Sequence, residues 1–278
     1  MSTKEAVVLG LVEGLTEYLP VSSTGHLILA SRLMGMDDSE ARKEAVDAYT
    51  ICIQAGAILA VLLLYWRRFK AMLLGMAGKD DAGKKMGILL VAAFIPAAVF
   101  GLLLNKKIKA VLFGIWPIVA AWLIGGIAIL LIARSWQKSQ TTQVGKPLEE
   151  LSLKDAITIG LLQCIAMWPG TSRSLMTILG GRFVGLKMDA SVEFSFLLGL
   201  ITLGAATVYE GYKSGALIFS VFGWQAPMIG FVVGFISAII SVKWMVGYIN
   251  RYGLALFGWY RILLAVVVGY FAYTGYFA

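Results

Sequence analysis

Apolar and polar residues alternate along this chain in long blocks, and most of the apolar blocks have the length of a membrane-crossing helix. A helix that crosses about 30 Å of hydrocarbon needs about 20 residues. We expect transmembrane helices at residues 47–66, 86–104, 113–133, 190–210, 224–249 and 257–277. Two further apolar runs, 5–19 and 155–168, are too short to cross.

Each short run is followed by a proline break and then by a hydroxyl-rich restart. Pro20 cannot continue a helix, because it lacks the amide hydrogen and its ring clashes with the preceding turn. Ser22-Ser23-Thr24 then has the composition of a helix start. Pro169-Gly170 and Thr171-Ser172-Arg173-Ser174 repeat this pattern. We therefore predict two re-entrant helical hairpins, at 5–35 and 155–187, each entering and leaving the membrane on one side.

The two halves of the chain resemble each other. Gly10-Leu11-Val12-Glu13 aligns with Gly160-Leu161-Leu162-Gln163, and the proline breaks follow at matching distances, with a gap of one residue. Three spans separate the hairpins, so the second hairpin enters from the opposite side. The pattern predicts a single membrane domain, 1–278, built as an inverted-topology repeat of 1–133 and 155–278. In such repeats the broken helices meet near the midplane and form a site.

Composition agrees with a polytopic, all-α membrane protein, since 59% of the residues are hydrophobic and only 14% are charged. The net charge of +8 does not indicate nucleic acid, because most of the Lys and Arg residues lie in short loops beside apolar runs. Loops 67–85, 134–154 and 243–257 carry most of the positive charge, which predicts that they are cytoplasmic. Both termini and the mouth of the first hairpin then face outward, and we expect no cleaved signal peptide.

Loop 36–47 is predicted to be an acidic surface loop on the outer side. Its acidic residues are Asp37, Asp38, Glu40, Glu44 and Asp47. Cys52 and Cys164 lie in apolar runs without metal-like spacing, and we interpret both as small core residues.

The first hairpin concentrates the chemistry of the chain. Glu13 and Glu17 are four residues apart and lie on one helix face, and His26, the only histidine, lies one turn beyond Ser22 and Ser23. Ionisable groups at membrane depth are costly and are usually functional, and a helix start favours phosphate. The simpler interpretations are acids near the membrane surface, a structural histidine and capping hydroxyls.

The second hairpin adds a cation, Arg173. A planar guanidinium suits phosphate, but it could instead pair with Glu13, Glu17 or Glu193. Gln54 and Glu193 are interpreted equally well as helix-contact residues or as supports for the site. The candidate phosphate ligands are Ser22, Thr24, Thr171, Ser172, Arg173 and Ser174.

The two motifs, at 13–26 (EGLTEYLPVSSTGH) and 169–174 (PGTSRS), resemble the signature motifs of the bacterial undecaprenyl-pyrophosphate phosphatase family, also called the bacitracin-resistance family. The similarity extends over essentially the whole chain, including the 193–198 run and the segment around Gln54. One departure follows the second motif, where Leu175-Met176 stands in place of the family's frequent Gly-Ala.

The resemblance implies an integral enzyme of the bacterial cytoplasmic membrane. Such an enzyme removes the terminal phosphate of undecaprenyl pyrophosphate and regenerates the lipid carrier for peptidoglycan. The resemblance also implies a divalent cation, Mg²⁺ or Ca²⁺, and a site that faces the periplasm or exterior. The expected partners are this polyprenyl substrate and membrane lipids, with no nucleic acid, and the sequence leaves a homodimer open.

The mechanism stays open between several hypotheses. Arg173 and the hydroxyls of Ser172, Ser174 and Thr24 would hold the pyrophosphate. Glu13 and Glu17 would bind the cation, or one of them would act as base. Either Ser23 or His26 is the nucleophile, or His26 activates a water or the Ser23 hydroxyl as a base. A lipid-phosphate flippase is the competing class, because inverted repeats with broken helices are typical of transporters and a flippase needs no nucleophile.

Overall fold

The protein is built from α-helices. The computed structural model describes residues 1–36, 40–138 and 144–276, and these ranges contain no β-strand. The helices are α1 (Thr3–Thr16), α2 (Ser23–Leu33), α3 (Glu40–Leu64), α4 (Trp66–Met76), α5 (Asp81–Leu112), α6 (Ile115–Lys138), α7 (Leu153–Gln163), α8 (Arg173–Phe183), α9 (Met188–Phe222), α10 (Gln225–Tyr252) and α11 (Ala255–Tyr273). Short 3₁₀ turns lie at Leu148–Glu150 and Cys164–Met167. The predicted all-α class is confirmed.

Among the described residues, six helices are long and apolar enough to cross a membrane: α3, α5, α6, α9, α10 and α11. They coincide with the six predicted spans, so this part of the prediction is confirmed. Several of them run well beyond the predicted ends. α5 has 32 residues and α9 has 35, which is longer than a bilayer requires.

The predicted loop at 36–47 is wrong from residue 40 onward. Asp37 and Asp38 lie outside the described residues, but α3 already begins at Glu40 and includes Glu44 and Asp47. Acidic residues are favourable in the first turns of a helix, because the amino end carries a partial positive charge. The acid-rich composition therefore extends the helix beyond the apolar core instead of ending it.

The basic connection predicted at 67–85 contains a further helix, α4, which the sequence analysis missed. Met72 and Gly75 face inward and are buried, whereas Arg67 and Lys70 are exposed. Gly75 lies so close to α5 that a Cβ atom there would be 2.1 Å from the backbone nitrogen of Lys84. The sequence analysis interpreted the basic residues as a loop and therefore missed the amphipathic pattern of buried and exposed positions in α4.

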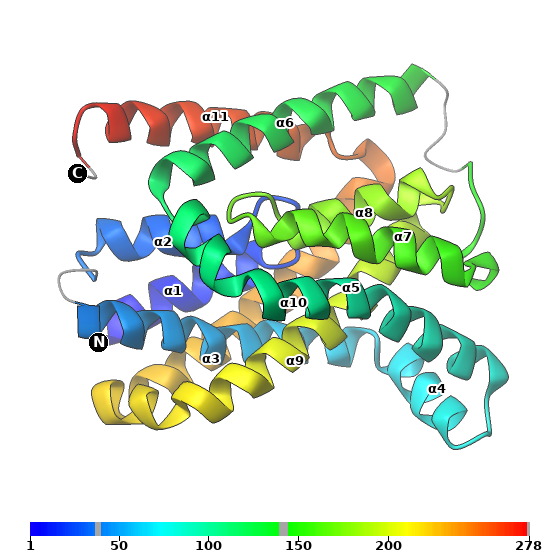
Figure 1. The fold of residues 1–278 in the computed structure, drawn as a ribbon, viewed down its shortest axis with the longest axis horizontal. Coiled ribbons are helices and arrows are strands. Elements are labelled where there is room, and N and C mark those ends of the chain that lie inside the picture. The colour runs from blue at the N-terminus through cyan, green and yellow to red at the C-terminus, as the bar shows by residue number, and fades with distance from the viewer. Residues whose placement is uncertain (37–39, 139–143, 277–278) are drawn as a thin grey trace.

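Both predicted hairpins consist of two short helices around a break. α1 ends before Pro20 and the chain restarts at Ser23, while α7 and its 3₁₀ extension end before Pro169 and the chain restarts at Arg173. In Figure 1, α1 and α2 come from the end of the molecule that carries the N-terminus, and α7 and α8 from the opposite end. The depth at which the hairpins enter a membrane stays a prediction.

The two hairpins begin and restart in the same way, which agrees with the predicted repeat. Ser2 and Glu5 form a reciprocal capping box at the start of α1, and Ser152 and Asp155 form one at the start of α7. Ser22 and Ser172, at the two restarts, have φ angles of 74° and 77°. They are the only non-glycine residues with positive φ in the described ranges.

Helices of one half pack against helices of the other half in a symmetric way. α1 packs along α10, and its counterpart α7 packs along α5. α3 packs against its own counterpart α9, and α6 packs against its own counterpart α11. An approximate two-fold relation between the halves produces this pattern of contacts. The division into repeats at 1–133 and 155–278 remains a prediction.

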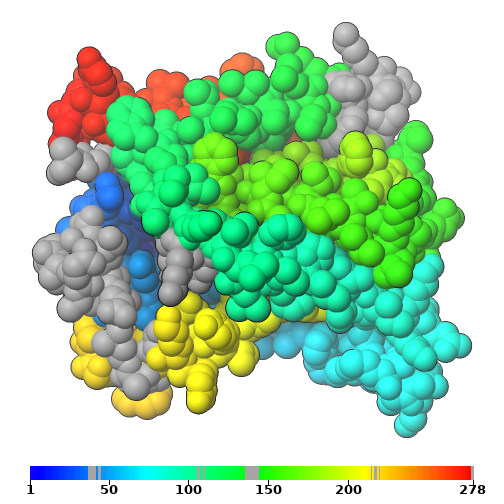
Figure 2. All heavy atoms as spheres, viewed as in Figure 1, coloured from blue at the N-terminus to red at the C-terminus, as the bar shows by residue number. Residues whose placement is uncertain are grey.

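The first hairpin is held against α10 by small residues. A Cβ atom on Gly10 would lie 2.7 Å from the carbonyl oxygen of Gly230, and one on Gly14 would lie 2.3 Å from that of Gly234. Small residues four apart on both helices let the backbones approach closely, as in many membrane helix pairs. Figure 2 shows that α5, α6, α7 and α9 cover most of one face, where the first hairpin is visible only near the left edge.

Candidate active site

The break at Pro20 brings the polar groups of the first hairpin together. Glu17 lies at the carboxyl end of α1, and the chain turns back so that α2 begins with Ser23. The hydroxyl of Ser23 donates a short hydrogen bond to Oε2 of Glu17. Both residues are buried, with exposed fractions of 8% and 6%.

Glu17 also contacts the second hairpin. Nη2 of Arg173, the first residue of α8, lies 3.1 Å from Oε1 of Glu17. The guanidinium is held further by the backbone oxygen of Ser195, 3.0 Å from Nη1, and by the Tyr18 ring, whose centroid is 5.2 Å from Cζ. Each oxygen of Glu17 therefore has a partner, one a hydroxyl and one a cation.

Arg173 fits into α9 because Gly199 leaves room for it. A Cβ atom at position 199 would lie 2.5 Å from Nη1 of Arg173. The pair with Glu17 is one of the simpler interpretations considered for Arg173. Glu193, another partner considered, instead forms an ion pair with Arg68 at 2.6 Å. Glu193 therefore joins α9 to α4 and does not belong to the hairpin site.

Glu13 lies one turn before Glu17 and interacts with it electrostatically. Its side chain is 1% exposed, and neither carboxylate oxygen has a hydrogen-bond partner in the described structure. A buried carboxylate without a donor is unfavourable unless a cation or another ligand completes its surroundings. Within the described residues of the cluster, Glu13 is thus the carboxylate whose bonding is incomplete.

A cavity of about 460 Å³ opens beside Glu13 and Ser23. Thr24 is exposed at its wall, and Gln54 lines it from α3 while contacting Thr207 of α9 at 3.4 Å. The cavity extends along the outer part of α2 and reaches Glu210. It is large enough for a phosphate headgroup with part of a chain, and most of its wall is apolar.

The serine-rich restarts mainly hold the two hairpins against each other. Oγ of Ser22 accepts from the amide of Gly170 at 3.2 Å and does not cap its own helix. The hydroxyls of Ser172 and Ser174 both donate to the carbonyl of Leu19, at 3.4 and 2.8 Å. Ser172 Oγ also accepts from the third amide of α8, as a cap does. Thr171 is buried beside these contacts.

His26 points away from this cluster. Its Nδ1 lies 2.6 Å from the carbonyl oxygen of Ser22 and its Nε2 lies 2.8 Å from the hydroxyl of Tyr260. Because a carbonyl only accepts, Nδ1 carries a proton, and in the neutral ring Nε2 then accepts from Tyr260. The ring stacks on Tyr260 and meets Trp122 edge-on. The structure brings together Glu13, Glu17, Ser23 and Arg173, but not His26.

The described residues do not form a ready-made metal centre, since no three His, Cys, Asp or Glu side chains in these ranges lie close enough together. The unpartnered carboxylate of Glu13 nevertheless suits a hard cation, which prefers oxygen ligands. Glu17 fits less well, because both of its oxygens are engaged. A cation at this position would need further oxygens from a ligand and from water.

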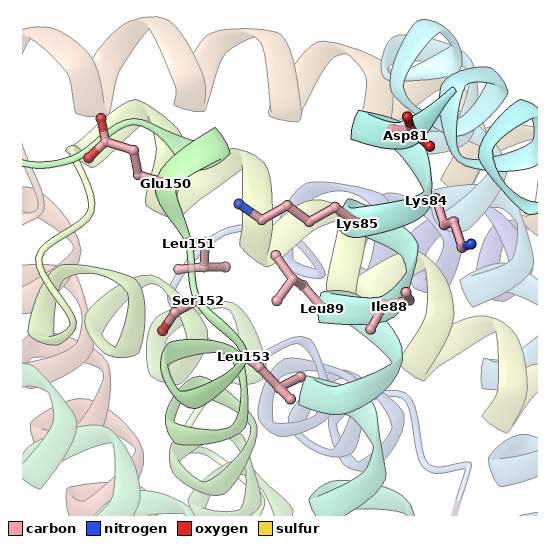
Figure 3. Close-up of a pocket in the computed structure, with 9 residues that line it drawn as sticks. All are labelled: Asp81, Lys84, Lys85, Ile88, Leu89, Glu150, Leu151, Ser152 and Leu153. Atoms are coloured by element: carbon pink, nitrogen blue, oxygen red, sulfur yellow. The ribbon is translucent and has the colours of Figure 1, made fainter. Parts of the chain in front are cut away.

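A second cavity, of about 470 Å³, lies elsewhere and contains none of these residues. Figure 3 shows it between the first turns of α5 and the 150–153 segment, with Lys85 extended across it.

An ion pair lies at the start of the second hairpin, where Nζ of Lys146 is 2.6 Å from Oδ2 of Asp155. Partial burial opposes ionisation there, but hydrogen bonds from Lys146 and Ser152 lower the pKa of Asp155 to about 2. These contacts anchor the start of the second hairpin.

Two residues of α11 that contact the hairpins were not predicted from the sequence. Tyr260 binds His26, and Arg261 is completely buried against the hairpin breaks. A signal was available for Arg261, because it is an isolated charge inside an apolar span, the same argument that singled out Arg173. Nothing in the sequence indicated Tyr260, since tyrosine is common near membrane interfaces.

Comparison with known proteins identifies close relatives. Residues 6–267 match the family described as bacitracin resistance protein BacA. The chain is 43% identical to the undecaprenyl-diphosphatase of Sorangium cellulosum, over 95% of this chain and 84% of that protein. It is 44% identical to undecaprenyl-diphosphatase 2 of Rhodospirillum rubrum, over 98% of this chain and 95% of that protein.

Proposed function

The chain belongs to the bacitracin resistance protein BacA family, and from this membership we propose that it is an undecaprenyl-diphosphatase with Ser23 as nucleophile and Glu17 as general base. It hydrolyses undecaprenyl pyrophosphate to undecaprenyl phosphate and inorganic phosphate, which returns the lipid carrier to cell-wall synthesis. The observation that carries the assignment of roles is the hydrogen bond from Ser23 to Glu17.

The reaction runs in two displacements. Glu17 takes the proton of the Ser23 hydroxyl while Oγ attacks the terminal phosphorus, and the bond to the bridging oxygen breaks, so that undecaprenyl phosphate leaves. The product on the enzyme is a phosphoserine. Glu17 gives this proton to the undecaprenyl phosphate that leaves, and is a carboxylate again. It then deprotonates a water that attacks the phosphoserine, the bond between phosphorus and Oγ breaks, and Glu17 returns the proton to Oγ as phosphate is released. The contacts of His26 favour Ser23 over His26 as nucleophile, because both ring nitrogens are engaged elsewhere.

Arg173 is the principal ligand of the transferred phosphate. Arg173 and the nucleophile Ser23 both contact Glu17, so the guanidinium lies near the nucleophile. Its planar fork matches two phosphate oxygens. The amino ends of α2 and α8 lie at the same two breaks, and a helix start favours an anion such as phosphate. Thr24, at the cavity wall, supplies a hydroxyl, whereas Ser22, Thr171, Ser172 and Ser174 act chiefly by fixing the two breaks against each other.

Glu13 is the protein ligand for a divalent cation, Mg²⁺ or Ca²⁺. When bound, the cation supplies neutralisation of the pyrophosphate charge. Support for this assignment comes from the buried, unpartnered carboxylate of Glu13 and from its position on the cavity that contains Ser23. Glu17 is the weaker ligand candidate, because Ser23 and Arg173 occupy its oxygens.

The enzyme lies in the bacterial cytoplasmic membrane and its site opens to the exterior. The cavity is lined by residues near the outer end of α2 and the beginning of α3, on the side that carries the N-terminus. The opposite side carries the basic helix α4, which the positive-inside rule assigns to the cytoplasm. The polyprenyl chain of the substrate then lies among membrane lipids beside the cavity.

The test is phosphate release from undecaprenyl pyrophosphate by the detergent-purified protein, with and without EDTA, beside Glu17→Ala. We expect cation-dependent release that the variant lacks. No release from folded, lipid-supplemented protein would overturn the assignment. A flippase would bind the same headgroup without needing the Ser23–Glu17 pair, so the relatives and this geometry together favour hydrolysis.

A further inference from the structure

Arg261 is a cation buried completely within the bundle, in α11, far along the chain from both hairpins. Nη1 donates to the carbonyl oxygens of Pro20 and Thr171, at 3.3 and 3.1 Å. Nη2 donates to those of Ala121 and Gly170, both at 2.8 Å. No carboxylate pairs with it in the described structure. The partners of this arginine are therefore backbone atoms, three of them at the helix breaks.

The three break carbonyls belong to different hairpins. Pro20 is the break of the first hairpin, while Gly170 and Thr171 form the break of the second. Carbonyls at a helix break have no intrahelical partner, and at membrane depth no bulk water replaces it. The single guanidinium of Arg261 therefore donates hydrogen bonds to free carbonyl oxygens at both breaks. It also connects them to α6 through Ala121.

The geometry of a guanidinium suits this role specifically. Its five donors lie in a rigid plane, so two nitrogens can each bind two carbonyls in fixed directions, whereas the three donors of a lysine radiate from one atom. The guanidinium packs directly against α6 at Gly125. A Cβ atom on Gly125 would lie 2.3 Å from Nη2 and 2.9 Å from Cζ of Arg261. The space beside Arg261 thus admits only a glycine without rearrangement.

We propose that Arg261 is a positioning residue for phosphoryl transfer, which fixes the spacing between the nucleophile on one hairpin and the phosphate-binding arginine on the other. Ser23 follows Pro20 by three residues, and Arg173 follows Thr171 by two. A shift of either break moves one group relative to the other. The proposal rests on the function proposed above for Ser23 and Arg173.

The kinetic test compares Arg261→Lys and Arg261→Gln with Arg251→Gln, an exposed arginine on α10. Misplacing reacting groups by about 1 Å can cost about 100-fold in rate. We therefore expect kcat to fall about 100-fold in both Arg261 variants, with KM changed less than about threefold, because the cavity and the lipid contacts remain. The Lys variant keeps the charge, so normal turnover by it would overturn the proposal.

A second variant leaves Arg261 in place. Gly125→Ala pushes a methyl group into the guanidinium and should lower kcat, whereas Gly247→Ala should not, since a Cβ atom at that mid-helix position meets nothing within 4 Å. Wild-type kcat in folded Gly125→Ala would count against the proposal. This variant keeps the test decisive if the Arg261 variants fail to fold.

A third measurement does not depend on activity. Hydrogen exchange followed by mass spectrometry should show faster amide exchange in the peptides around 17–26 and 168–176 of Gly125→Ala, and little change in α3 or α9. Faster exchange limited to α6 and α11 would mean that Arg261 only joins those two helices, and it would overturn the proposal. If wild-type protein released no phosphate but these exchange changes appeared, the proposed function would fail and the link between the hairpins would stand.

Discussion

Ser23 and Glu17 lie on opposite sides of the break in the first hairpin and are joined by a short hydrogen bond. The serine hydroxyl donates, so the carboxylate oxygen that accepts is already placed to take its proton. The other oxygen of Glu17 faces Arg173 of the second hairpin. One carboxylate thus connects the proposed nucleophile with the proposed phosphate ligand, and several predictions depend on it.

Replacing Glu17 by Gln should lower kcat about 1,000-fold without unfolding the protein. The amide keeps the shape of the side chain but cannot accept the proton, and general base catalysis typically contributes 10²–10⁴-fold. Phosphate release and size-exclusion profiles would be measured together. Retention of more than a tenth of wild-type turnover would remove Glu17 from the role of base.

Arg173→Lys should raise KM for undecaprenyl pyrophosphate and lower kcat/KM by about 10–100-fold. Hydrogen bonds to charged groups contribute about 1.5–3 kcal/mol, and lysine loses the two-oxygen contact while keeping the charge. Arg67→Lys makes the same change at an exposed position of α4 and is the matched control. Unchanged kcat/KM in Arg173→Lys would show that Arg173 serves only as the partner of Glu17.

His26→Asn should keep at least a tenth of wild-type turnover, whereas His26→Phe should lose far more. The amide nitrogen of Asn occupies nearly the place of Nδ1 and can still donate to the carbonyl of Ser22, and Phe cannot. The comparison separates a structural donor from an acid or base. A His26→Asn variant as inactive as Ser23→Ala would assign proton transfer to His26.

Glu13→Gln should raise the Mg²⁺ concentration required for half-maximal activity about tenfold or more, because a neutral amide is a much weaker ligand than a carboxylate. Glu150→Gln makes the same charge change beside the cavity of Figure 3, away from the hairpin breaks, and should leave the Mg²⁺ dependence unchanged. The same half-maximal concentration in Glu13→Gln as in the wild type would exclude Glu13 as the cation ligand.

Gly14→Ala should destabilise the protein, since its methyl group would lie 2.0 Å from Oγ of Ser237 and 2.3 Å from the carbonyl of Gly234. Overpacking of a tight contact typically costs about 1–3 kcal/mol. The unfolding temperature in detergent measures the effect. Gly204→Ala on α9, which meets nothing within 4 Å, is the control, and an equal effect in both variants would argue against close packing of α1 on α10.

The fold was predictable where the local sequence alone determines the structure. Proline ends a helix in any surroundings, so Pro20 and Pro169 predict the two breaks. The six long apolar runs have the length that a helix needs to cross a membrane. α4 was not predictable in the same way, because its stability depends on packing Gly75 against α5. Charge alone suggested a loop there.

The composition of the site was predictable from the sequence, but its internal bonding was not. Spacing placed Glu13, Glu17 and Ser23 near the first break. It also placed His26 one turn from Ser23, yet the histidine turns to Tyr260, a residue 234 positions away. Such a partner is set by how α11 packs, and no local pattern encodes it. Arg261 is the opposite case, since an isolated charge inside an apolar span can be recognised in the sequence, although we did not predict this residue.

The central claim is that Ser23 attacks the phosphorus, and acid-quenched turnover tests it most directly. The enzyme would be mixed with substrate that carries ³²P in the terminal phosphate, quenched within milliseconds, digested and mapped. We predict an acid-stable label on the peptide that contains Ser23, absent in Ser23→Ala. A burst of undecaprenyl phosphate without protein-bound label, or an acid-labile label at His26 revealed by an alkaline quench, would contradict the account.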